Sequence, residues 1–328
     1  MTKRNPILHW LLGALISCCT VAASANTKLD LGGYTDGSGA ITVLHGGDSA
    51  DPYFAMQALL LAHDNGLNIS REAGKFVNWL LPHQKPDGTF DRFCRGTDKG
   101  WMSCKTADAD DSLLALWMRL LETMPLELRN VPARAKSYSI SEASLNHLFQ
   151  PSRGIYMVSP VYLHGLFMDN LEVWSLNMHT KQPARAAAAA KLKRAINDTF
   201  WDPDKKRFLV STQLEQKTQP EAFYPDKVAQ VFPMLVNFPV PGGDSRSYYS
   251  NWMKMHRAEW LRQGEADYPW GLLAVLASRQ GDQGSARCWM REATPLRHGP
   301  RWAVTDEVSY QILVSKGVST ASKAAPCK

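Results

Sequence analysis

The chain has 328 residues, of which 45% are hydrophobic, and a formal net charge of +6 at pH 7. This charge is mild and spread along the sequence, which argues against a nucleic-acid-binding protein. No Gly/Ser tract, Pro-rich spacer or charge block interrupts roughly residues 45 to 315. A single large domain is therefore the simpler interpretation of the length.

The N-terminus has the pattern of an export signal. Lys3 and Arg4 precede an apolar run over residues 7–22, and the small residues 23–25 stand before Asn26. This order predicts a signal peptide over residues 1–25 and a periplasmic or secreted mature chain. Without Lys3 and Arg4, the formal charge falls from +6 to +4.

A second interpretation of the same region makes the protein a lipoprotein, processed after residues 15–17 and anchored through a lipidated Cys18. Neither interpretation leaves a membrane span. No later segment approaches the roughly 20 consecutive apolar residues that a transmembrane helix needs.

Four cysteines remain in the mature chain, in a compartment where disulfides persist. Cys94 and Cys104 flank a loop rich in Gly and charge, which predicts a local disulfide, whereas pairing of Cys288 with Cys327 is left open. The spacings do not suggest a zinc site, and no phosphate-binding loop is visible. We therefore expect no metal and no cofactor.

Helical patterns alternate between two kinds along the chain. Segments 51–63, 108–121 and 267–278 are apolar on nearly every face, whereas the segments that follow two of them, 70–81 and 284–293, and the intervening segment 183–197 are amphipathic. Buried helices alternating with half-exposed ones indicate an inner and an outer ring. We expect an all-α fold, an (α/α)6 toroid over residues 51–315.

The remaining segments complete this prediction. Residues 26–50 form an N-terminal segment and residues 316–328 a C-terminal tail. Residues 40–44 and 207–212 have the composition of short strands, which we expect as one or two β-hairpins at the lips of a cleft.

Acidic residues stand at the start of each expected inner helix. They are Asp48, Asp51, Asp108, Asp110, Asp111, Asp169, Glu172, Asp226, Glu265, Asp267, Asp306 and Glu307. Parallel inner helices would bring these starts to one mouth of the ring. Capping and the helix dipole favour acids there in any protein, but three acids within residues 108–111 repel one another, which favours a functional role for at least one.

Aromatic residues accompany these helix starts, notably Trp101, Tyr224, Trp270 and Trp302. Aromatic planes stack on the C–H faces of sugar rings, while carboxylates bind sugar hydroxyls. Filling the core of a large α-helical protein is the competing explanation for these side chains.

These residues resemble the six-hairpin glycosidase superfamily, and most nearly the family 8 bacterial endoglucanases. Residues 106–116 (TADADDSLLAL) are similar to the Ser-Asp-Ala-Asp segment of that family, which implies that Asp108 and Asp110 bind the central sugar. Residues 46–53 (GGDSADPY) occupy the place of a segment whose Glu is the general acid. No Glu stands there in this chain, so only Asp48 or Asp51 could substitute.

Two further segments resemble this superfamily. Residues 265–270 (EADYPW) are similar to the region that supplies the catalytic base, which implies that role for Asp267. Residues 168–174 (MDNLEVW) are similar to inner-helix acids of other six-hairpin enzymes. Glu172, beside Trp174, is with Asp48 a candidate proton donor, because burial against aromatic surface keeps a carboxyl protonated.

A different chemistry also fits part of the chain. Residues 108–111 (DADD) match the Asp-x-Asp-Asp acid of squalene-hopene and class II diterpene cyclases, and residues 84–90 resemble their Gln-and-aromatic repeat. Asp110 would then donate a proton to an alkene.

The leading hypothesis is an exported glycoside hydrolase that acts on a polysaccharide, with an exopolysaccharide export system as an expected partner. Its candidate catalytic residues are Asp48, Asp110, Glu172 and Asp267. Its candidate substrate-binding residues are Asp51, Trp101, Asp108, Asp111, Asp169, Tyr224, Asp226, Trp270, Arg301 and Trp302. A polysaccharide lyase, using candidates such as His164, His179, Tyr224, His298 and Arg301, is one alternative. A non-catalytic carbohydrate-binding protein is the other.

Overall fold

A computed structural model describes residues 27–98, 100–179, 183–319 and 327. The predicted signal peptide and Cys18 lie outside the described residues. Within them, no helix combines the length and the apolarity needed to cross a membrane.

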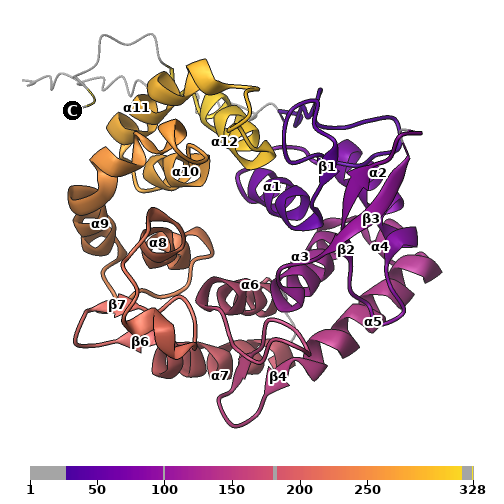
Figure 1. Cartoon of the computed structure of the whole chain (residues 1–328), viewed down its shortest axis with the longest axis horizontal. Helices are drawn as coiled ribbons and strands as arrows, with labels where there is room; N and C mark the ends of the chain where they lie inside the picture. Colours follow the sequence, from indigo (N-terminus) through magenta and orange to yellow (C-terminus); the bar gives the residue numbers. More distant parts are fainter. Residues whose placement is uncertain (1–26, 99, 180–182, 320–326, 328) are drawn as a thin grey trace, which may run out of the picture.

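Two concentric rings of helices form the molecule (Figure 1). The inner ring consists of α1 (Pro52–Asp64), α3 (Asp110–Thr123), α6 (Phe167–Met178), α8 (Val228–Leu235), α10 (Gly271–Arg279) and α12 (Val304–Ser315). Around it lie α2 (Ser70–Leu80), α4 (Leu126–Arg129), α5 (Pro132–His147), α7 (Pro183–Phe200), α9 (Ser245–Trp260) and α11 (Gln283–Ala293). The first inner helix packs against the last, so α1 and α12 close the ring. The predicted toroid is confirmed.

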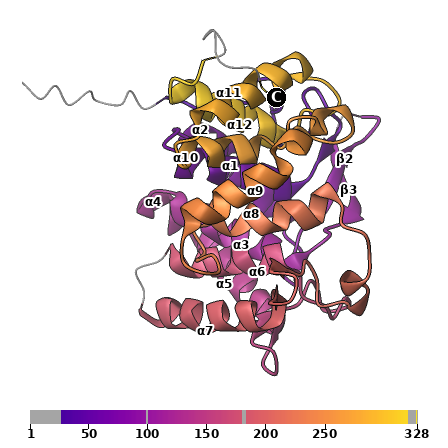
Figure 2. The same cartoon turned by 90° about the vertical axis from the view of Figure 1, so that its left-hand side faces the viewer.

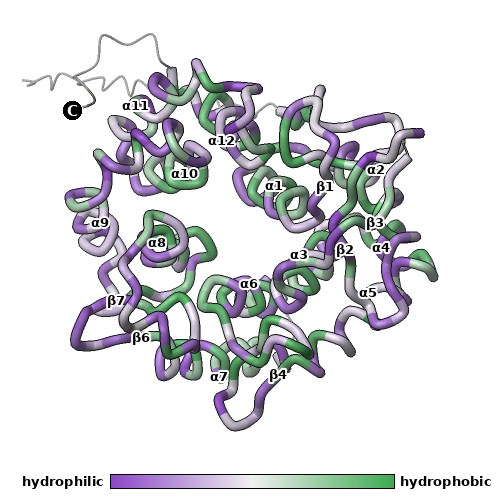
Figure 3. The backbone as a smooth tube through the Cα atoms, in the orientation of Figure 1, coloured by the Kyte–Doolittle hydropathy of each residue, from purple (hydrophilic) through white to green (hydrophobic). Residues whose placement is uncertain are grey.

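Burial patterns explain which helices lie inside. In α10, the seven residues from Gly271 to Ala277 are all buried. Outer helix α7 buries only Ala189, Leu192, Ile196 and Phe200, which lie at helical spacing on one stripe. Figure 3 shows the same contrast, with the hydrophobic colour concentrated on inner helices such as α1 and α6.

A non-helical segment stands where a further outer helix would complete the ring. Residues 27–48 pack against α12 and the α1–α2 turn, and they bury Leu29, Leu31 and Ile41. Backbone hydrogen bonds join Val304 to Val43 and Leu29 to Asn68. This segment therefore covers the junction at which the ring closes.

The predicted strand over residues 40–44 is wrong. These residues make only isolated bridges, Ile41 with Thr35 and Leu44 with Ala303, because they turn repeatedly instead of running beside a partner strand. Over residues 207–212, only the two residues of β7 (Arg207–Phe208) pair with β6 (Trp201–Asp202).

The largest sheet stands at one end of the ring. It is antiparallel and joins β1 (Ser49–Ala50), β2 (Asp91–Arg95) and β3 (Trp101–Thr106) in that order. A further hairpin pairs β4 (Phe149–Gln150) with β5 (Ile155–Tyr156). Figure 2 shows the β2–β3 hairpin and α4 at opposite ends of the ring.

Both disulfides considered from the sequence are present. Cys94 joins Cys104 across the β2–β3 hairpin, with 5.7 Å between their Cα atoms. Cys288 in α11 joins Cys327, which fastens a described residue of the C-terminal tail to the outer ring.

Candidate active site

One cavity of about 380 Å³ opens at the N-terminal ends of the inner helices. Its wall includes Tyr53 of α1, Ser112 of α3, Asp169 of α6, Val228 of α8 and Thr305 of α12. The inner helices thus converge with their N-termini on one site, as a toroid requires. Pockets of this size hold small ligands or single sugar units of a larger one.

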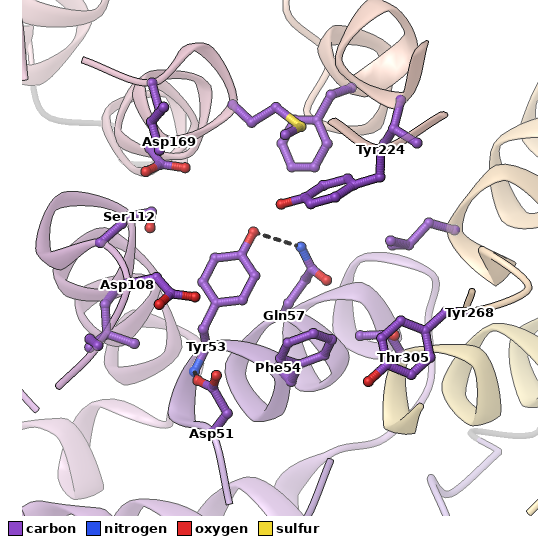
Figure 4. Close-up of a pocket in the computed structure, with 18 of the residues that line it drawn as sticks. Asp51, Tyr53, Phe54, Gln57, Asp108, Ser112, Asp169, Tyr224, Tyr268 and Thr305 are labelled. Atoms are coloured by element: carbon purple, nitrogen blue, oxygen red, sulfur yellow. Dashed lines mark hydrogen bonds between the residues drawn. The ribbon is translucent and has the colours of Figure 1, made fainter. Parts of the chain in front are cut away.

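The cavity brings together six of the candidate residues proposed from the sequence. They are Asp51, Asp108, Asp169, Tyr224, Asp267 and Trp270. Figure 4 shows Asp108, Ser112 and Asp169 on one side, Tyr224 and Tyr268 on the other, and Tyr53 between them.

Asp169 is the most buried carboxyl among these six. It lies in the first turn of α6, and its side chain is 9% exposed. Burial raises the pKa of Asp169 to about 7, although its interaction with the carboxyl of Asp111 lowers it. Asp169 therefore holds a proton at the pH where an ordinary aspartate is ionised.

Asp111 and Glu172 lie behind Asp169, outside the cavity lining. Asp111 is fully buried, and burial together with the charge of Asp169 raises its pKa well above the usual range. Glu172 accepts a hydrogen bond of 3.0 Å from the Tyr53 hydroxyl, and burial raises its pKa as well. These two acids support the cavity floor from below.

Tyr53 connects this buried group to the cavity. Its hydroxyl donates to Glu172 and accepts a hydrogen bond of 3.0 Å from the side-chain amide of Gln57. Burial raises the pKa of Tyr53, so the hydroxyl stays protonated. The sequence gives no sign of this role, because a Tyr next to the cap of a buried helix is ordinary core composition.

Asp267 and Trp270 form another wall, just before α10. The indole of Trp270 donates to Asp267 Oδ2 at 3.2 Å. The Trp270 ring stacks on Tyr224, with 4.9 Å between centroids and 25° between planes. Trp270 has a φ of 55°, a left-handed conformation that is uncommon outside glycine and that aims its ring at Tyr224.

Asp306 is an additional carboxyl in the wall, outside the candidate set. It accepts hydrogen bonds from the backbone N–H groups of Gly271 at 2.7 Å and Ala303 at 3.1 Å, one on each oxygen. Burial raises its pKa to about 7. Because both oxygens are occupied, Asp306 joins α10 to α12 and offers little to a ligand.

The rim is set by Arg92 of β2. Its guanidinium lies 2.9 Å from Asp51 Oδ2 and also forms an ion pair with Asp108. Asp51 is in turn the N-cap of α1, accepting from the Tyr53 N–H at 3.0 Å. A register shift between Arg92 and Phe93 places this arginine, and such a bulge leaves no clear signal in the sequence.

The other candidates lie outside this cavity. Asp48 is exposed before β1, and Asp110 starts α3 with its backbone N–H bonded to Val158. Asp226 accepts from the Ala222 N–H. Each acid sits at a turn or helix start, where backbone N–H groups need acceptors.

Local packing also explains the three remaining candidates. Trp101 donates to Asp36 in the β2–β3 region, and Trp302 is fully buried and donates to Glu307. Arg301 donates to the backbone carbonyl of Glu265. None of the three lines the cavity.

Among the lyase candidates, only Tyr224 lines the cavity. His179 caps the opposite end of α6 beside Arg119, and His298 stacks on His45 next to Glu307. Within the described residues, no group of three or more His, Cys, Asp and Glu side chains is arranged to hold a metal ion.

No protein-family model and no curated protein matches the sequence. Among solved structures, the fold is similar to an α-amylase from Clostridium perfringens, with 9% identity, coverage of 87% of this chain and 94% of that chain, and a TM-score of 0.57. It is also similar to the GH63 mannosylglycerate hydrolase from Thermus thermophilus in complex with glucose. That match has 11% identity, coverage of 88% and 97%, and a TM-score of 0.51.

An uncharacterized conserved protein from Thermus thermophilus is similar over 88% of this chain and 98% of its own, with 11% identity and a TM-score of 0.53. At such low identities the likeness shows the fold alone. The chain has the six-hairpin toroid that glycosidases use, and its activity has to be argued from the cavity.

Proposed function

We propose that the protein is a glycoside hydrolase in which Asp169 donates a proton to the leaving oxygen and Asp267 acts as the catalytic carboxylate. The observation that carries the proposal is one cavity that holds a protonated buried acid, a second carboxylate and a stacked aromatic pair. Such a pair of carboxyl groups is what glycoside hydrolysis requires.

The roles follow from the surroundings of each group. Asp169 keeps a proton because it is buried, whereas Asp267 is half-buried and accepts a hydrogen bond from Trp270. Asp169 protonates the glycosidic oxygen as the C–O bond breaks. Asp267 either removes a proton from the attacking water or attacks the sugar carbon itself.

The shape of the cavity favours action at a chain end. Inner helices contribute wall residues on every side, so a polysaccharide has no groove to run through. A terminal sugar would enter, with its ring against Tyr224 and Trp270 and its hydroxyls toward Asp108 and Ser112. Residues 106–116 remain the feature that supports a relation to family 8 endoglucanases.

Export is part of the same proposal. The disulfides Cys94–Cys104 and Cys288–Cys327 fit an oxidising compartment, where the predicted signal peptide would deliver the chain. Cell fractionation with mass analysis of the mature N-terminus tests this point. A full-length chain in the cytoplasm would contradict it.

Two substitutions test the assigned roles. Asp169→Asn and Asp267→Asn should each lower kcat on oligosaccharides by about 10²- to 10⁴-fold, the usual contribution of an acid or base. Asp48→Asn is the matched control, because that exposed acid lies outside the cavity. Circular dichroism would confirm that each variant is folded.

Leaving-group dependence separates the acid from the base. An aryl glycoside with a strongly acidic phenol needs no proton donor, so it should recover much of the activity of Asp169→Asn and none of that of Asp267→Asn. Equal losses on both substrate types would contradict the assignment of Asp169.

The non-catalytic sugar-binding protein is the second candidate, favoured by the absence of the family 8 Glu from residues 46–53. A pure binder would keep its sugar affinity in both variants and release no product in the wild type.

A further inference from the structure

The cavity is acidic by formal count. Within the described part of the chain, one cation lines it, Arg92, against five carboxyl groups: Asp51, Asp108, Asp169, Asp267 and Asp306. Even with Asp169 and Asp306 protonated, the remaining acids outnumber the cation. The potential inside therefore favours a positively charged ligand over a negatively charged one.

Arg92 is not available to an anionic ligand. Its guanidinium lies between Asp51 and Asp108, with an ion-pair contact to each. A uronate in the cavity would have to break this arrangement while facing several carboxylates. The site is thus built against acidic sugars.

Aromatic faces add to the preference for a cation. Tyr224 stacks on Trp270, and Tyr268 meets Phe54 edge-on, with 6.2 Å between centroids. All four residues line the cavity. Carboxylates combined with aromatic faces are a common environment for ammonium groups in proteins.

One polar group in the wall also lacks a partner. Ser112 is 1% exposed, and its hydroxyl has no hydrogen-bond partner although it lines the cavity. Buried hydroxyls are rarely left unpaired. A ligand N–H or O–H group entering beside Asp169 would satisfy this oxygen.

We infer that the sugar unit bound in this cavity carries a free, protonated amino group, so that the substrate is a glycan containing non-acetylated hexosamine. The inference rests on the proposed function and names its substrate class. An N-acetyl group would remove the charge and would enlarge the sugar within a closed wall.

Affinity measurements on the mature protein test this inference. Calorimetry would compare glucosamine, N-acetylglucosamine, glucose and glucuronate at low ionic strength. Glucosamine should bind at least about tenfold more tightly than each of the others, and its advantage should shrink about threefold or more in 0.5 M NaCl, because salt screens exposed charges. Equal or tighter binding of glucose, N-acetylglucosamine or glucuronate would overturn the inference.

A charge variant sharpens the test. Asp108→Asn removes a rim carboxylate whose side chain is 82% exposed, so folding is not at risk, and it leaves Arg92 less neutralised. The advantage of glucosamine over glucose should fall severalfold in this variant and stay unchanged in Asp48→Asn. An unchanged advantage in both variants would contradict the inference.

The outcomes also separate the inference from the proposed function. Hydrolysis of neutral oligosaccharides with no preference for amino sugars overturns the inference and leaves the hydrolase intact. Selective binding of glucosamine without hydrolysis of any oligosaccharide leaves the inference and overturns the hydrolase.

Discussion

Asp169 should determine the alkaline side of the pH–activity profile. Its pKa is raised to about 7 by burial, and a general acid works only in its protonated form. We therefore expect kcat/KM to fall about tenfold per pH unit above pH 7. Initial rates on one oligosaccharide between pH 5 and 9 measure this. A profile that stays flat up to pH 9 would exclude Asp169 as the proton donor.

Asp111 should limit stability without being needed for chemistry. Its folded pKa is raised, so its favourable contribution is complete below the unfolded pKa near 4 and is lost as the pH rises toward the folded value. Asp111→Asn should therefore stabilise the protein at pH 8 by at least about 1.4 kcal/mol, the value of one pKa unit, and have little effect at pH 4.

Urea unfolding followed by tryptophan fluorescence measures this difference at the two pH values. Activity should be largely retained, because an amide can donate to Asp169 as the protonated carboxyl does. A variant that is equally destabilised at both pH values would contradict a protonated Asp111.

Single residues also show where prediction from sequence stops. Asp108 and Asp111 belong to one acidic run, yet the first is exposed at the rim and the second fully buried, because successive helical residues point about 100° apart. Composition favours acids at every helix start, so Asp48 and Asp226 carried the same signal as Asp169.

At the scale of elements, the contact between α10 and α12 positions the Asp267 wall. Gly271 begins α10, and a Cβ there would lie 2.6 Å from Ser309 Cβ and 2.8 Å from the Trp289 ring. Gly271→Ala should cost about 1–3 kcal/mol through overpacking and should reduce activity, because α10 and the Gly271–Asp306 hydrogen bond would move.

Gly74→Ala in α2 is the matched control, since its added Cβ would meet nothing within 4 Å. That change should stabilise the protein by about 0.5–1 kcal/mol, because alanine has the higher helix propensity. Thermal unfolding and specific activity of both variants test the pair. Equal stability changes would show that the two glycines are interchangeable.

The helices could be predicted well because burial writes a clear period. Segments 51–63 and 70–81 match α1 and α2 within one residue at each end, whereas 267–278 begins four residues before α10. The β2–β3 hairpin was visible only as a disulfide loop. The inward direction of Arg92 depends on a bulge, which backbone pairing decides.

At the scale of the whole molecule, buried acids should make stability fall as the pH rises. Asp111, Asp169, Glu172 and Asp306 all have raised pKa values because they are buried. Their contribution is complete near pH 4 and is lost through about pH 7, where Asp169 and Asp306 ionise. The free energy of unfolding should decrease from pH 5 to pH 8, and an increase over this range would contradict protonated acids beneath the cavity.

Ring closure is the feature that sequence patterns could not supply. The alternation of helices predicted a toroid, but the place of one outer helix is taken by residues 27–48, which have no helical period. Their buried residues Leu29, Leu31 and Ile41 fit the junction of α12 and α1 only in three dimensions. The shared site at the inner N-termini follows from that closure.

The most direct test of the hydrolase is the fate of solvent oxygen. The mature protein would be incubated in ¹⁸O-labelled water with neutral, amino-sugar and uronate oligosaccharides, and the products analysed by mass spectrometry. We predict shorter oligosaccharides that carry one ¹⁸O atom per bond cleaved, formed by the wild type and by Asp48→Asn but not by Asp267→Asn. Products with an unsaturated end and no label, or no product from any oligosaccharide, would contradict a hydrolase.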